Sequence, residues 1–264
     1  MNETKAQPGV IEPPFFSNWA DLFMPKIAHA LLPFAMKIGF LTPNFITLFS
    51  FALYVAGCVM IFIDVPGHAY YAAVLLPAAY VGDCLDGQVA RAKRLSSPLG
   101  NYLDKVLDVL KIYVLCMSMA WGAYKDTHDV IYVFLGFSAC FFFNFRYYIK
   151  LETIFSQCSR DPGYLAACAA RRQELYRQKG EEYRKHAGSL AGKIKLFWLK
   201  NRSLFWVDEA EFVVFTSIAM LLGKMEAVLW LFGVSQALIA GWRLFERGYQ
   251  THAAAEKLLD PMRK

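Results

Sequence analysis

The chain has 264 residues, of which 56% are hydrophobic and 16% aromatic, and its mean hydropathy is +0.30. This composition departs from that of a soluble domain and predicts several membrane-spanning segments. The formal net charge is +6, which in a membrane protein usually reflects cytoplasmic Lys and Arg, so nucleic acid is not an expected partner. The six cysteines form no C-x-x-C or Cys/His zinc pattern and are interpreted as packing residues.

The first 41 residues are predicted to form a polar tail followed by an interfacial helix. Residues 1–14 are polar and contain prolines, whereas apolar and polar residues recur at roughly helical spacing over 15–41. An amphipathic helix lying in the membrane interface fits this pattern. A soluble cap packed on the membrane domain is the alternative. The rest of the chain, 42–264, is predicted to be one membrane domain.

Apolar segments then follow one another at lengths that suit membrane spans. Thr42 can cap the first of them, and Pro43 suits its first turn. The predicted spans cover about 45–63, 69–92, 99–122, 130–149, 205–223 and 225–245. The expected fold is therefore an all-α integral membrane bundle of about six transmembrane helices with an N-terminal interfacial amphipathic helix.

Basic residues are distributed unevenly between the connections. The loop at 91–94, a polar insert at about 151–204 and the tail after Arg243 hold most of the Lys and Arg. The insert is rich in helix formers and is expected to be a helical excursion from the membrane. The positive-inside rule predicts that both termini and the insert face the cytoplasm, in a multi-pass protein of the cell (inner) membrane.

Four aspartates occur at fixed spacing around the basic loop. They belong to the pattern Asp83-x-x-Asp86-Gly87-x-x-Ala90-Arg91, followed by Gly100-x-x-x-Asp104-x-x-x-Asp108. The first pair lies on one face of its helix and the second pair is one turn apart on the next, so a hairpin lets all four converge. Carboxylates near a bilayer are costly, and hard divalent cations with oxygen ligands relieve their mutual repulsion.

This pattern resembles the signature of the CDP-alcohol phosphotransferase (CDP-alcohol phosphatidyltransferase) family, D-x2-D-G-x2-A-R-x8-G-x3-D-x3-D, at every fixed position. The resemblance implies a membrane enzyme that moves a phosphate-linked alcohol group from a CDP carrier to a hydroxyl and releases CMP. It also implies two divalent cations, Mg²⁺ or Mn²⁺, held by Asp83, Asp86 and Asp104. Asp108 is implied to be the general base and is also a candidate metal ligand.

Candidates for contact with the donor surround the aspartates: Gly87, Ala90, Arg91, Gly100, Asn44 and Thr47. Gly87 and Ala90 lack bulk, which permits either close approach of a nucleotide or close helix packing. Arg91 can pair with diphosphate oxygens, or serve only as a topology charge. Gly100 suits tight packing, and Asn44 and Thr47 could either reach the nucleotide or make local hydrogen bonds.

The acceptor is not defined by the motif. Arg146 and Arg243 would suit a phosphorylated, anionic alcohol, whereas Glu209 and Glu211 would suit a cationic one. The leading hypothesis is transfer of a phosphatidyl group from CDP-diacylglycerol to a small alcohol in phospholipid biosynthesis. The alternative is a CDP-linked polar alcohol, of the choline, ethanolamine or polyol type, that donates to a lipid or polyol hydroxyl.

A divalent-cation transporter is the remote alternative. It should carry acidic residues at mid-membrane in several spans and often an internal repeat, whereas here the acids cluster on one side. The expected partners are therefore a CDP-linked donor, a small alcohol and membrane lipids, with a homodimer as a candidate assembly.

Overall fold

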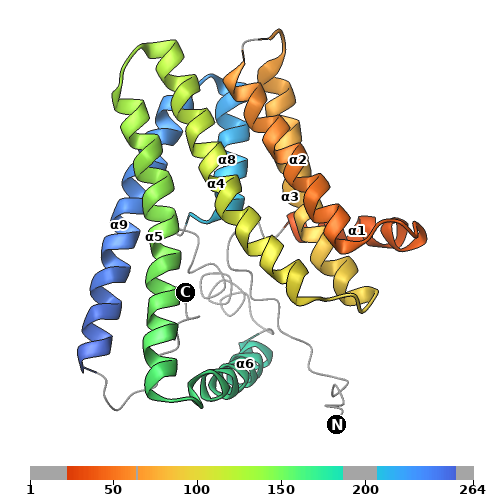
Figure 1. The fold of residues 1–264 in the computed structure, drawn as a ribbon, viewed down its shortest axis with the longest axis vertical. Coiled ribbons are helices and arrows are strands. Elements are labelled where there is room, and N and C mark those ends of the chain that lie inside the picture. Colours follow the sequence, from red (N-terminus) through yellow and green to blue (C-terminus); the bar gives the residue numbers. More distant parts are fainter. Residues whose placement is uncertain (1–22, 64, 187–206, 254–264) are drawn as a thin grey trace.

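The structure is a computed structural model that describes residues 23–63, 65–186 and 207–253. Every regular element within these ranges is a helix, as the sequence predicts (Figure 1). The helices are α1 (Met24–Lys37), α2 (Pro43–Phe62), α3 (His68–Ala92), α4 (Pro98–Thr127), α5 (Ile131–Arg160), α6 (Tyr164–His186), α8 (Glu209–Leu222) and α9 (Met225–Ala253).

Local capping explains where several helices begin and end. The Thr42 hydroxyl accepts a hydrogen bond from the Phe45 amide at 3.3 Å, so the predicted cap of α2 is confirmed. Ser97 does the same for the Gly100 amide at 3.0 Å at the start of α4. Gly223 ends α8 with a φ of 61°, in the left-handed region that glycine adopts without strain.

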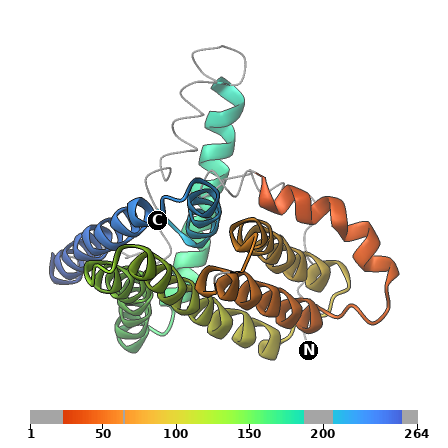
Figure 2. The same cartoon turned by 90° about the horizontal axis from the view of Figure 1, so that it is seen from above.

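Six helices, α2 to α5, α8 and α9, make up the bundle among the described residues (Figures 1 and 2). Helix α3 packs against α2 on one side and α8 on the other, while α4 contacts α2 and α5, and α9 lies along α5. The apolar core runs through these contacts; Phe212 of α8 stacks on Phe232 of α9 with ring centroids 3.9 Å apart. The arrangement brings α8, late in the chain, beside the helix that carries the first two aspartates.

Three of the bundle helices are long and apolar enough to cross a membrane, judged by length and composition: α2, α4 and α9. Helices α3, α5 and α8 occupy the positions of the other predicted spans. These apolar helices indicate a membrane protein. A count of six spans stays a prediction.

Helix α1 lies across the outer side of the bundle against α3 (Figure 2). Gln88 donates a hydrogen bond to the Pro25 carbonyl at 3.0 Å, and Lys93 donates to the Ile38 carbonyl at 3.2 Å. Large apolar side chains on α1 nevertheless face outward: Ile27, Leu31 and Phe34 are exposed. The exposed apolar surface favours the interfacial location, which stays a prediction, and residues 15–22 of the predicted helix lie outside the described residues.

The predicted insert begins inside a helix. Helix α5 continues past the predicted end of the span near residue 149 to Arg160, because the polar residues that follow the apolar stretch continue the same helix. Helix α6 then projects beyond the bundle (Figure 2), and its charged surface includes the pair Arg177 and Glu174, joined at 3.0 Å. The rest of the insert, 187–204, lies outside the described residues.

Candidate functional site

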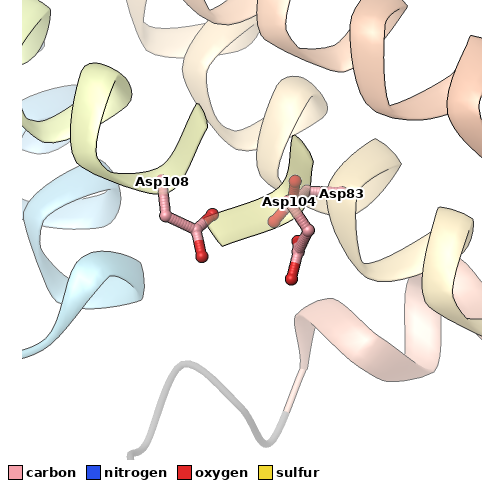
Figure 3. A group of neighbouring side chains, drawn as sticks. All are labelled: Asp83, Asp104 and Asp108. Atoms are coloured by element: carbon pink, nitrogen blue, oxygen red, sulfur yellow. The ribbon is translucent and has the colours of Figure 1, made fainter. Parts of the chain in front are cut away.

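Three of the four aspartates converge where α3 and α4 meet. One carboxylate oxygen each from Asp83, Asp104 and Asp108 lies within 4.8 Å of the others. Figure 3 shows the three side chains together, Asp83 from α3 and the other two from α4. The i, i+4 spacing places Asp108 one helical turn beyond Asp104. All three are partly buried, with side-chain exposures of 15% for Asp83, 33% for Asp104 and 19% for Asp108.

The fourth aspartate, Asp86, is turned toward α2. The Thr47 hydroxyl donates to Asp86 Oδ2 at 2.5 Å, and both residues are buried. This contact depends on close approach of the two helices at Gly82, where an added Cβ would overlap the Ser50 hydroxyl of α2. Thr47, which the sequence suggested as a nucleotide contact, is therefore a neighbour of a metal-ligand candidate in this structure.

Two lysines of α4 neutralise part of the aspartate cluster, and the sequence analysis assigned a role to neither. Lys111 Nζ lies 2.5 Å from Asp83 Oδ1 and 3.1 Å from Asp108 Oδ1, and its side chain is only 2% exposed. Lys105 Nζ lies 2.7 Å from Asp104 Oδ2 and 3.1 Å from Asp108 Oδ2, but it is 63% exposed. The available signal was spacing: Lys105 lies three residues before Asp108 and Lys111 three residues after it, and residues at this spacing are neighbours on a helix.

The two glutamates at the start of α8 have different surroundings. Glu209 Oε1 lies 3.7 Å from Lys111 Nζ, so this side chain faces the aspartate cluster. Glu211 is almost fully buried, and its Oε2 accepts a hydrogen bond from the Asp208 amide at 3.1 Å as part of a capping box. Glu209 therefore adjoins the aspartate cluster through its ion pair with Lys111.

The two arginines suggested for an anionic acceptor interact with protein groups. The Arg146 guanidinium donates at 2.6 Å to both Asp208 Oδ1 and Gln236 Oε1, and at 3.2 Å to the Val207 carbonyl. It therefore ties α5 to α9 and to the start of α8. Arg243 forms a 2.6 Å ion pair with Glu246 within α9.

The donor candidates flank the cluster on the side of the α3–α4 connection. Arg91 is exposed, and its guanidinium lies along Gly87, where an added Cβ would come within 3.4 Å of Arg91 Nη1. Ala90 is half-buried on the same helix. Gly100 packs closely on the start of α2, since an added Cβ would lie 3.0 Å from Asn44 Oδ1. Gly100 and Asn44 thus meet each other, as the packing interpretation of Gly100 expects.

The chemistry of the cluster fits a hard divalent cation. Its donors are carboxylate oxygens from two helices, the ligand type that Mg²⁺ and Mn²⁺ prefer. The two lysine ammonium groups occupy the same carboxylates, which shows that the site attracts positive charge. Asp83, Asp104 and Asp108 could therefore hold a metal ion, and Asp86 lies one turn from Asp83 on α3.

Comparison with known proteins agrees with this site. Residues 40–156 match the family model for CDP-alcohol phosphatidyltransferase, and this segment contains all four aspartates, Arg91 and Lys111. No curated protein matches the chain. The matched segment covers α2, α3 and α4 and most of α5, and it ends before α8 and α9. The match supports the family that the aspartate motif indicates, a family that transfers phosphatidyl groups in phospholipid synthesis.

Proposed function

We propose that the protein transfers a phosphatidyl group from CDP-diacylglycerol to the hydroxyl of a small alcohol and releases CMP. The convergence of Asp83, Asp104 and Asp108 inside the family's segment is the observation that carries this proposal. The acceptor oxygen forms a bond to the phosphorus that bears the diacylglycerol. The bond from that phosphorus to the oxygen of the CMP phosphate breaks, and the acceptor's proton passes to the protein.

Asp108 is the proposed recipient of that proton. It lies about 15 Å along α4 from Pro98, one turn further than Asp104, so an attacking hydroxyl beside it sits deeper than the outer ligand. Lys111 holds its Oδ1 and Lys105 contacts its Oδ2 at the exposed side. A general base contributes roughly 10²–10⁴-fold to such a step.

Asp83, Asp86 and Asp104 are the proposed ligands of two divalent cations, Mg²⁺ or Mn²⁺. When bound, such ions neutralise the diphosphate and stabilise the leaving oxygen. Asp86 uses Oδ2 in its hydrogen bond with Thr47, and Oδ1 is the oxygen that this bond leaves for a ligand role. Thr47 then orients Asp86, in addition to any contact with the nucleotide.

The donor's diphosphate is proposed to lie along Gly87 and Ala90, with Arg91 as its counter-charge. The absence of a side chain at Gly87 leaves room that the Arg91 guanidinium borders. A forked guanidinium can bind two phosphate oxygens at once. The active site, the insert and both termini are proposed to face the cytoplasm.

On the acceptor side, the contacts favour Glu209 over the two arginines. All three side chains form ion pairs, but the partner of Glu209 is Lys111, which also contacts Asp108, whereas the described ion pairs of Arg146 and Arg243 are with Asp208 and Glu246, outside the aspartate cluster. An uncharged or cationic alcohol is therefore proposed over a phosphorylated one. The same aspartates would also serve the alternative reaction, in which a CDP-linked polar alcohol donates to a lipid hydroxyl.

The proposal is tested by CMP release from purified protein given each donor class with a panel of alcohols. CDP-diacylglycerol with a neutral or cationic small alcohol is expected to support release, and CDP-choline or CDP-ethanolamine with diacylglycerol is not. Release only with the second pair of substrates would reverse the assignment of donor and acceptor. Release stimulated only by phosphorylated alcohols would contradict the proposed acceptor class.

A further inference from the structure

Lys111 is a buried cation in contact with carboxylates from three helices. Its Nζ lies 2.5 Å from Asp83 on α3, 3.1 Å from Asp108 on α4 and 3.7 Å from Glu209 on α8, and only 2% of its side chain is exposed. A lysine in such a place is tolerated only with carboxylate partners, because an unpaired buried charge is strongly destabilising. The ammonium group and the carboxylates therefore fix one another's positions.

Lys105 offers a contrast on the same helix. It also bridges two aspartates of the cluster, at 2.7 Å and 3.1 Å, but its side chain is 63% exposed. An exposed ion pair contributes little to the position of its partners. The flexible side chain of Lys105 can also move into solvent when a metal or diphosphate binds. The buried side chain of Lys111 cannot move into solvent in this way, so its contacts can persist when a metal ion is bound.

Lys111 contacts only one carboxylate oxygen of each aspartate. It binds Oδ1 of Asp83 and Oδ1 of Asp108, which leaves Oδ2 of each carboxylate directed away from that contact. Groups that hold the second atom of a ligand in this way fix its orientation, and their loss typically costs about 10–100-fold in metal affinity or activity. Glu209 contacts Lys111 from α8, outside the segment that matches the family model.

We propose that Lys111 is a positioning residue of the metal-binding carboxylates, and that Glu209 holds it in place, so that α8 completes a site whose ligands all lie on α3 and α4. This role rests on the proposed function, because it assigns Asp83 and Asp108 to the site of the divalent cations. In this proposal Glu209 orients Lys111, and Lys111 in turn orients Asp83 and Asp108.

The test measures Mn²⁺ binding to the purified full-length protein by the electron paramagnetic resonance signal of free Mn²⁺. Asp104→Asn identifies the binding that belongs to the cluster. Lys111→Met is expected to weaken it by about 10–100-fold. Lys111→Arg, which keeps the charge, is expected to bind more tightly than Lys111→Met. Glu209→Gln is expected to weaken binding to a smaller extent, and it keeps the proposal testable if Lys111→Met fails to fold.

Lys105→Met is the matched comparison, and its loss of Mn²⁺ affinity is expected to be smaller than that of Lys111→Met. Equal losses in both variants would overturn the proposal. So would unchanged or tighter binding in Lys111→Met, because removal of a cation that merely repels the metal would tighten binding. If Lys111 only stabilised the fold, Lys111→Met would lower the unfolding temperature and leave the Mn²⁺ affinity of the folded fraction unchanged.

The outcomes separate this inference from the proposed function. If the wild-type protein binds Mn²⁺ but releases CMP from no donor, the proposed function fails while the positioning role can still be read from the variants. If it releases CMP while Lys111→Met and Glu209→Gln bind Mn²⁺ as tightly as the wild type, the positioning role fails alone. Failure of the wild-type protein to bind Mn²⁺ would overturn both.

Discussion

Replacement of Arg146 by methionine should destabilise the protein without weakening its use of the acceptor. The substitution keeps much of the side-chain volume and removes the charge that Asp208 and Gln236 contact at 2.6 Å. These contacts join α5 to α9 and to the residue that caps α8. The expected result is therefore a loss of stability, with an unchanged acceptor KM in the folded fraction.

The magnitude follows from the burial of the pair. Arg146 and Asp208 are 12% and 19% exposed, so the variant leaves a mostly buried carboxylate without its partner. Breaking such a pair costs about 3–5 kcal/mol, and the residual exposure of both groups places the value toward about 3 kcal/mol. For a chain of this size, about 2–4 °C per kcal/mol predicts a fall of about 6–12 °C in the unfolding temperature.

Thermal unfolding of the detergent-purified protein measures the loss of stability, and CMP release at varied acceptor concentration measures the acceptor KM. Arg243→Met is the comparison, since its described ion pair, with Glu246, lies within α9 and joins no second helix, so its loss should lower the unfolding temperature less. An Arg146→Met protein of wild-type stability with a raised acceptor KM would refute the reasoning and return Arg146 to the binding of an anionic acceptor.

Three further predictions concern the donor, the base and the topology. Asp108→Asn should abolish turnover while CDP-donor binding survives, whereas Asp83→Asn should weaken donor binding as well; calorimetry showing equal losses would remove this division of roles. Arg91→Lys should weaken donor binding in a folded protein, because an ammonium group cannot form the forked contact, and unchanged affinity would leave Arg91 a topology charge. In a cysteine-free background, a cysteine at Ser189 should be shielded from a membrane-impermeant reagent in intact cells, and one at Thr127 should react; the reverse pattern would invert the proposed topology.

Much of the fold could be predicted because the information is local. Helix periodicity, runs of apolar residues and the cap at Thr42 each depend on a few neighbouring residues. The continuity of α5 to Arg160 was not specified, because residues 150–160 are polar enough to indicate an insert, although nothing in them breaks a helix. The pairing of α3 with α8 depends on contacts between distant segments, which local patterns do not specify.

The candidate site divides in the same way. The spacing of the four aspartates was sufficient to predict a hairpin that brings them together, and in the structure Asp83, Asp104 and Asp108 meet. The spacing of Lys111 from Asp108 offered a local signal, but its other two partners lie 28 and 98 positions away, so only the packed helices show that these groups meet. The orientation of Asp86 toward Thr47 likewise depends on the close approach of α2 and α3, which no motif encodes.

Metal dependence of CMP release tests the central claim most directly, since the claim is that the converging aspartates hold divalent cations during phosphatidyl transfer. Purified protein with CDP-diacylglycerol and an accepted alcohol should release CMP in Mg²⁺ or Mn²⁺, lose the activity in excess EDTA and regain it when the metal is restored. Asp104→Asn should reduce release at every metal concentration. Full release in excess EDTA, or wild-type release by Asp104→Asn at limiting metal, would contradict the account.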